Sequence, residues 1–276
     1  MMQHATAPSS VEPIYVGVSS KMYLGYADSL RWLGELRHEV DTRPALKAGR
    51  VVPFVIPSFP VLPAARDILA GSPILLGAQD CGWADGPWTG EVSPSMLAEL
   101  GVGLVEIGHA ERRLHFGEDE AMIARKVRAA AGAGLTALLC VGEETAAPAA
   151  PQSAASFVFR QIQAATGGDR GLAARLVVAY EPVWAIGAAE PAGAGYVSDV
   201  VRHLRSELAD AGLPELAIIY GGSAKPGLLP ALRGLSGIFL GRFAHRAANV
   251  GKVLDEALAQ AGHQETGGQT ARQGRR

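Results

Sequence analysis

The chain has 276 residues, of which 48% are hydrophobic and 19% charged, and its formal net charge is −2. Both signs of charge are mixed along the sequence, which argues against a nucleic-acid or membrane-surface partner. No stretch approaches the ~20 apolar residues of a membrane span. The length fits one α/β barrel or two smaller domains, with a core that needs no disulfide or structural metal.

The two ends of the sequence differ in composition from the middle. Residues 1–13 contain no basic stretch followed by an apolar one, so we expect a disordered tail without a secretory signal. Residues 262–276 are polar and rich in Gly, Gln and Arg, so we expect a second disordered tail. Cys81 and Cys140 lie in no CxxC or Cys/His cluster, which is typical of reduced thiols in a cytoplasmic protein.

Eight short apolar runs alternate with stretches of helical spacing. The predicted strands are Ile14–Val18, Val51–Ile56, Ile74–Ala78, Val102–Ile107, Thr136–Val141, Val177–Tyr180, Ala217–Tyr220 and Ile238–Leu240. The helical stretches include Met122–Ala131, Phe157–Ala165, Val197–Leu208 and Val250–Ala261. Because the runs are almost continuously apolar, each predicted strand is buried on both faces, as in a parallel sheet.

This alternation predicts the α/β fold class and one domain over residues 14–261, since no linker or change of composition divides it. Eight units favour a single (β/α)8 TIM barrel, in which no edge strand is left over. A doubly wound sheet is the alternative, but no GxGxxG motif follows the first predicted strand. In a barrel, catalytic groups lie just past the C-terminal ends of the strands.

Three candidate catalytic residues follow predicted strands: Lys21 the first, His109 the fourth and Glu181 the sixth. Glu181 stands in AYEPVW, where apolar neighbours desolvate the carboxylate and make it a better base. His109 precedes AERR, a plausible helix start whose backbone N–H groups would lower its pKa and keep it neutral. Taken singly, the three also fit a surface lysine, a structural histidine and a buried ion pair.

Glycine-rich turns accompany the last two predicted strands, as Gly221-Gly222-Ser223 and Gly237–Gly241. Free backbone N–H groups in these two loops form the usual phosphate site of a barrel. With the charge of Lys21 nearby, the pattern indicates a small phosphorylated substrate. No cluster has metal-ligand spacing, so we expect neither metal nor cofactor, and proton transfer by Glu181 and His109 alone.

With these residues in place, the chain resembles the triosephosphate isomerase family from about residue 14 to residue 261. The shared motifs are Ser-Lys-Met (20–22), GAQD (77–80), WTGEVSP (88–94), EIGHAERR (106–113), CVGE (140–143), AYEPVWAIG (179–187), YGGS (220–223) and FLGR (239–242). The resemblance implies that Glu181 removes a proton from the carbon beside a carbonyl. Neutral His109 would polarise the oxygens and move protons between them, and Lys21 would stabilise the enediolate.

The resemblance also implies supporting roles. Glu111 would pair with Lys21 in the resting site, and residues 184–194 would form a lid that closes over the phosphate. Thr89, in the region 79–91, would reach into the active site of a second subunit, so the family expectation is a homodimer. The residues implied to contact the phosphate are Gly187, Ser223 and Gly241.

The sequence departs from the family pattern around this site. Ser19 and Ser20 replace the usual Asn and Trp before Met22, and Ala188-Ala189-Glu190 replaces the Thr-Gly-Lys of the lid tip. Ala110 follows the histidine in place of Ser, and Arg242 replaces a glycine. Ser19 would open space at the carbonyl end of the substrate and could hydrogen-bond an extra hydroxymethyl group. The Arg242 side chain would either bind the anion or turn outward.

This pattern resembles the branch of the family that interconverts L-erythrulose 1-phosphate and D-erythrulose 4-phosphate. Two alternatives stay open: an ordinary triosephosphate isomerase, and a non-catalytic relative that binds a sugar phosphate. In each case the expected partner is a small phosphorylated sugar, with no nucleic acid and no membrane.

Overall fold

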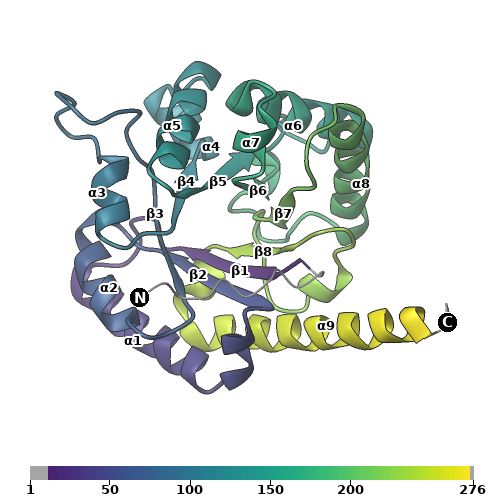
Figure 1. The fold of residues 1–276 in the computed structure, drawn as a ribbon, viewed down its shortest axis with the longest axis horizontal. Coiled ribbons are helices and arrows are strands. Elements are labelled where there is room, and N and C mark those ends of the chain that lie inside the picture. Colours follow the sequence, from purple (N-terminus) through teal and green to yellow (C-terminus); the bar gives the residue numbers. More distant parts are fainter. Residues whose placement is uncertain (1–11, 274–276) are drawn as a thin grey trace.

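The computed structural model describes residues 12–273. Eight parallel strands form a closed barrel in chain order (Figure 1). They are β1 Ile14–Ser19, β2 Val51–Ile56, β3 Leu75–Ala78, β4 Leu104–Ile107, β5 Thr136–Val141, β6 Leu176–Tyr180, β7 Ala217–Tyr220 and β8 Gly237–Leu240. Tyr15 of β1 pairs with Gly237 of β8 and closes the ring. The predicted (β/α)8 TIM barrel is confirmed, and closure excludes the doubly wound alternative.

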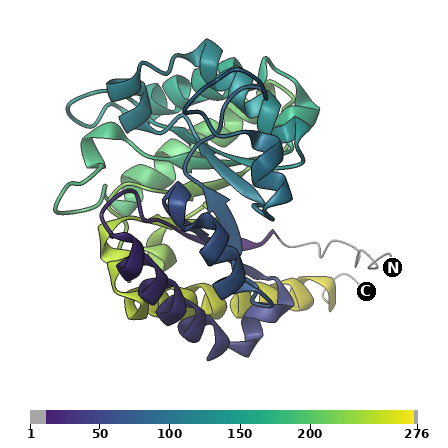
Figure 2. The same ribbon diagram turned by 90° about the vertical axis from the view of Figure 1, so that its left-hand side faces the viewer.

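Helices follow the strands and surround the barrel (Figures 1 and 2). They are α1 Tyr26–Asp41, α2 Leu62–Leu69, α3 Pro94–Glu99, α4 Ala110–Phe116, α5 Glu120–Gly132, α6 Pro151–Thr166, α7 Arg170–Ala173, α8 Ala194–Asp210 and α9 Ala247–Gln273. α9 packs against α1, so the last helix joins the first and completes the outer layer. No helix in residues 12–273 is long and apolar enough to cross a membrane.

Two apolar layers lie on opposite sides of the strands. Leu104 of β4 belongs to the cluster inside the barrel, whereas Val105 and Ile107 pack outward against the helices. Since side chains alternate along a strand, Glu106 points inward with Leu104. The inner cluster contains Phe54, Ile56, Leu104, Leu138, Cys140, Val177, Ala179, Ile219 and Phe239. A carboxyl group thus enters an otherwise apolar lining.

The C-terminal segment differs from the expected disordered tail. α9 begins at Ala247 and continues through the range 262–273, where we expected disorder. Residues added to an existing helix require no new nucleation, so a polar sequence of modest propensity can extend a helix that is already packed. The expected N-terminal tail, residues 1–13, lies almost wholly outside the described residues.

Candidate active site

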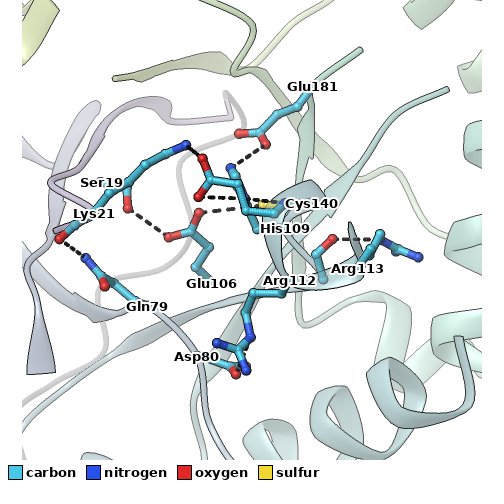
Figure 3. Close-up of polar contacts among 12 residues, drawn as sticks. Ser19, Lys21, Gln79, Asp80, Glu106, His109, Arg112, Arg113, Cys140 and Glu181 are labelled. Atoms are coloured by element: carbon cyan, nitrogen blue, oxygen red, sulfur yellow. Dashed lines mark hydrogen bonds and ion pairs between the residues drawn. The ribbon is translucent and has the colours of Figure 1, made fainter. Parts of the chain in front are cut away.

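A cavity of about 560 Å³ opens where the strands end. Its size suits a small ligand. Loops after β1, β4, β6, β7 and β8 bring Lys21, His109 and Glu181 together in it (Figure 3). The cavity is lined by nine of the ten residues proposed from the sequence, which are Ser19, Lys21, His109, Glu111, Glu181, Gly187, Ser223, Gly241 and Arg242. Thr89 lies elsewhere, exposed in the loop between β3 and α3.

His109 is held as a neutral imidazole. It caps the N-terminus of α4, where the backbone N–H of Glu111 donates to Nδ1 at 3.1 Å. Burial, reinforced by the charge of Lys21, lowers the pKa of His109 to about 4. Because Nδ1 accepts a hydrogen bond, Nε2 carries the proton and faces the cavity. We expected the helix N–H groups to lower the pKa, but burial is the larger cause.

Glu181 presents a desolvated carboxyl group across from that imidazole. Its Oε2 lies 3.4 Å from His109 Nε2, and among the described residues no group donates a hydrogen bond to it. Burial raises the pKa of Glu181 well above its ordinary value, and the carboxyl of Glu106 raises it further. Once ionised, such a carboxylate is a strong base because little solvation stabilises its charge.

Gly221 leaves the space that Glu181 occupies. A Cβ atom at Gly221 would lie 2.3 Å from Glu181 Oε1 and 2.6 Å from its Cγ. The position directly after β7 therefore requires glycine. The close contact with the Gly221 backbone helps to hold the Glu181 carboxyl group in position.

Lys21 has a left-handed backbone, with φ of 47°, which is uncommon for a residue with a side chain. Its carbonyl oxygen accepts hydrogen bonds from Ser58 Oγ at 2.7 Å and Gln79 Nε2 at 2.8 Å. The expected ion pair is present, since Lys21 Nζ contacts Glu111 Oε1. These contacts hold the ammonium group beside His109 and Glu181.

Glu106 lies in this site although we did not single it out from the sequence. It is 4% exposed, lines the cavity, and accepts a hydrogen bond from Ser19 Oγ at 2.9 Å (Figure 3). Burial raises its pKa to about 7. One signal could have identified it, because Glu106 is the only charged residue in the eight described strands.

The segment 184–194 is anchored at both ends by buried polar groups. At its start, Trp184 Nε1 donates to Glu143 Oε1 at 2.9 Å, and the hydroxyl of Tyr196 donates to the same oxygen at 2.9 Å. At its end, the N–H of Ala192 donates to Tyr220 Oη at 2.8 Å. Between these anchors, residues 187, 189 and 190 are exposed. Both ends of the segment are thus held by hydrogen bonds to side chains of the barrel, whereas its middle is exposed.

Side chains from the last two loops tie this segment to the rim of the cavity. Arg242 donates to the carbonyl of Gly187 at 2.9 Å, and Ser223 Oγ donates to the carbonyl of Ala185 at 2.8 Å. Lys225 Nζ pairs with Glu190 at 2.6 Å. Arg242 thus turns toward the segment 184–194, an arrangement that is neither the anion contact nor the outward ion pair considered from the sequence.

Behind α4, a second set of buried charges holds the segment that carries His109. Lys126 is 1% exposed and pairs with Asp80 at 2.7 Å and with Glu118 at 2.5 Å. Arg112 pairs with the same two carboxylates. Here each carboxylate meets two cations. Among the described residues no group of three or more His, Cys, Asp or Glu has the arrangement of a metal site.

Comparison with known proteins assigns the family. The family model for Triosephosphate isomerase matches residues 14–257. The chain belongs to the triosephosphate isomerase family. It is an isomerase, as its motifs indicated.

Several relatives within the family carry a more specific name. An L-erythrulose-1-phosphate isomerase from Pectobacterium atrosepticum is 45% identical, covering 90% of this chain and 97% of the relative. A protein of the same name from Mycolicibacterium smegmatis is 39% identical, covering 89% and 94%. A triosephosphate isomerase from Pelobacter propionicus is 37% identical, covering 85% and 95%.

A solved structure shares the architecture. The crystal structure of triosephosphate isomerase from Bartonella henselae aligns with a TM-score of 0.72 at 30% identity. The alignment covers 88% of this chain and 98% of that chain. The barrel and its loops therefore have a counterpart over nearly the whole of an isomerase of this family.

Proposed function

We propose that the protein interconverts L-erythrulose 1-phosphate and D-erythrulose 4-phosphate by proton transfer through an enediolate. The observation that carries the reaction is the pair formed by Glu181 Oε2 and His109 Nε2, 3.4 Å apart on the cavity floor beside Lys21. The substrate is supported by the serine at position 19 and by the relatives that bear this name.

The first step breaks the C3–H bond of L-erythrulose 1-phosphate. Glu181 takes the proton as a carboxylate, and the electron pair forms the C2–C3 double bond while charge develops on O2. His109 Nε2–H and the Lys21 ammonium stabilise that oxygen as it becomes negative. A neutral imidazole suits this task because, with its lowered pKa, it can donate to O2 and later recover a proton.

The second step moves the carbonyl from C2 to C3. His109 gives a proton to O2 and takes one from O3, and Glu181 returns its proton to C2. The products are a C3 carbonyl and a C2 hydroxyl, which is D-erythrulose 4-phosphate with the numbering reversed. No electron or proton is gained or lost overall, so the two ketose phosphates are isomers and no co-reactant is needed.

The phosphate is proposed to lie at the rim formed by Gly187, Ser223 and Gly241. Gly187 and Ser223 have left-handed backbones, with φ of 70° and 49°, a conformation found in turns that bind anions through N–H groups. Closure of residues 184–194 over it would exclude water from the enediolate. Arg242, now bound to the Gly187 carbonyl, is placed to follow this movement.

A paired steady-state assay tests the proposed substrate. L-Erythrulose 1-phosphate and D-glyceraldehyde 3-phosphate are offered separately to the purified protein, and kcat/KM is compared. We expect the tetrulose phosphate to be preferred by about 10²-fold or more, since a site built for a hydroxyl group discriminates against a substrate that lacks it. Preference for the triose phosphate would identify an ordinary triosephosphate isomerase. Binding of both without turnover would identify the non-catalytic relative.

We also propose that the protein works as a homodimer in the cytoplasm. The loop that carries Thr89 projects from the barrel (Figure 1), and the exposed apolar side chains near it in sequence include Trp88 and Met96. Such side chains are typical of an interface. The free, buried Cys81 and Cys140 agree with a reducing compartment. Light scattering at assay concentration checks the assembly, and a mass of one chain would contradict it.

A further inference from the structure

Glu106 is an unusual residue for the inside of a barrel. The positions around it on the inner face are apolar, and its own strand places Leu104 one layer below it. Its carboxyl is buried, and within residues 12–273 no Lys, Arg or His forms an ion pair with it. Burying a carboxyl without a cation is unfavourable, so a structural role alone does not account for its presence.

The two carboxyl oxygens have different surroundings. Oε2 accepts the hydrogen bond from Ser19 Oγ at 2.9 Å. Oε1 meets only a weak donor, Cys140 Sγ, at 4.0 Å. Ser19 donates its single proton to Glu106, so the lone pairs of its oxygen remain able to accept a hydrogen bond. The pair therefore offers one underused carboxyl oxygen and one hydroxyl acceptor beside the cavity.

Glu106 lies across the barrel from the phosphate rim, and Ser19 reaches it from the end of β1, the strand next to β8. β4 and β8 lie opposite each other in the closed ring of eight strands, and Glu106 is on β4 whereas Gly241 follows β8. Glu106 lies within β4 and His109 follows the end of that strand, so the carboxyl group lies deeper in the barrel than the imidazole (Figure 3). A substrate with its phosphate at the rim and its reacting carbons between Glu181 and His109 directs its far end toward Glu106.

We propose that Ser19 and Glu106 form the subsite that binds the terminal hydroxymethyl group of a four-carbon ketose phosphate and so select it over triose phosphates. The inference rests on the proposed function and deepens it by naming the groups that recognise the fourth carbon. The terminal hydroxyl donates its one proton either to Glu106 Oε1 or to the Ser19 oxygen. A triose phosphate has no fourth carbon and makes no hydrogen bond to these groups, so it gains no binding energy from them.

The chemistry of Glu106 suits this role. Burial raises its pKa to about 7, so near neutral pH the group is readily available in either protonation state. As a carboxylate it accepts from the terminal hydroxyl, and as a carboxylic acid it can also donate to that hydroxyl. Ser19 orients the group in both cases, because its hydroxyl can donate or accept.

The test compares two substrates in three versions of the protein. Glu106→Leu removes both carboxyl oxygens. It places an apolar side chain of similar size there, which suits the surrounding apolar cluster. We expect its kcat/KM for L-erythrulose 1-phosphate to fall about 10²-fold, and its kcat/KM for D-glyceraldehyde 3-phosphate to change less than about threefold. Glu106→Gln retains hydrogen-bonding oxygen and nitrogen atoms, and we expect it to recover most of the tetrulose activity.

A pair of serine variants supplies the matched control. Ser19→Ala removes one half of the subsite, and we expect the preference for the tetrulose phosphate to fall about tenfold. Ser236 is buried to a similar degree, 6% against 5% exposed, and its hydroxyl also donates to a glutamate, Glu12, at 3.3 Å. It lies outside the cavity, so Ser236→Ala should leave the preference unchanged.

The outcomes separate the two proposals. If the unmodified protein prefers the tetrulose phosphate and Glu106→Leu keeps that preference, the subsite is wrong and the proposed function stands. If the unmodified protein prefers the triose phosphate, both fall. If triose turnover is too slow to measure, dihydroxyacetone phosphate is used as an inhibitor of the tetrulose reaction. Its inhibition constant is then compared between variants in place of kcat/KM for the triose phosphate. A parallel rise of that constant in Glu106→Leu would also contradict a subsite specific for the fourth carbon.

Discussion

The floor and the rim of the cavity are held in different ways. On the floor, Glu181, His109 and Glu106 are buried, and each extends from the end of a strand. At the rim, Lys225–Glu190 and Arg242–Gly187 are exposed contacts between side chains and a loop. The floor cannot adjust without disturbing the barrel, whereas the rim contacts can exchange with water or a ligand at little cost.

This difference matches two requirements of proton transfer at carbon. The base and the acid must be within a few tenths of an ångström of their working positions before the substrate arrives. The phosphate site must open to admit substrate and close to exclude water. Changes on the floor should therefore affect the chemical step or the choice of substrate, and changes at the rim should affect binding.

The largest expected effect is on the floor. Glu181→Gln keeps the shape of the side chain and removes the base, so we expect kcat to fall about 10³- to 10⁴-fold. The rim carboxylate Glu190 offers a matched control, and Glu190→Gln should change kcat less than about threefold. Steady-state rates and a circular dichroism spectrum of each variant decide this. Similar losses in both would mean that floor and rim do not differ.

The next effect concerns stability. Burial raises the pKa of Glu106 from 4.5 to about 7, so the folded protein holds this proton more tightly than the unfolded chain. The resulting stabilisation is complete below pH 4.5 and is lost as pH rises through 7. Glu106→Leu escapes this loss, and we expect it to gain about 1 to 3 kcal/mol at pH 8, after allowing for the unpaired Ser19 hydroxyl.

Urea unfolding at pH 8 and pH 5 measures that gain. The difference between Glu106→Leu and the unmodified protein should shrink at pH 5, where Glu106 is protonated in the fold. A loss of stability at pH 8 would instead make Glu106 a structural anchor. If Glu106→Leu gains stability and loses tetrulose activity, Glu106 serves substrate binding at the expense of stability.

A smaller effect is expected at the rim. Arg242→Met keeps the backbone N–H but removes a guanidinium group next to the proposed phosphate, so we expect KM to rise about three- to tenfold with kcat nearly constant. Lys225→Met is its control, because among the described residues Lys225 forms an ion pair only with the exposed Glu190; KM should change less than about twofold. A fall in kcat for Arg242→Met would place Arg242 in the chemical step.

The smallest effect is a shift in a pH profile. The raised pKa of Glu181 predicts that kcat/KM increases with pH through a value well above that of an ordinary carboxyl group, because only the carboxylate accepts the proton. The carboxyl of Glu106 contributes to that raised pKa, so Glu106→Gln should move the acid limb to lower pH. An unmoved acid limb would mean that the two carboxyl groups do not interact.

The sequence predicted the barrel because strand burial and strand–helix alternation are local properties that a closed parallel sheet enforces eight times. It located Lys21, His109 and Glu181 because the fold places strand ends together. Glu106 was not identified because one charged residue does not change the apolar pattern of a strand. Its hydrogen-bond partner, Ser19, is 87 residues away in the sequence. The direction of Arg242 could not be predicted either, since it depends on a carbonyl of another loop.

The backbone at Lys21 has a consequence for how the lysine could be replaced. The hydrogen bonds from Ser58 and Gln79 hold the Lys21 carbonyl, so they do not depend on the side chain. Its φ of 47° is one that glycine adopts freely. Lys21→Gly would thus preserve the backbone conformation of the loop and leave a space next to Glu111 where the lysine side chain had been. A small alkylammonium ion dissolved in the buffer could occupy that space and replace the ammonium group of Lys21.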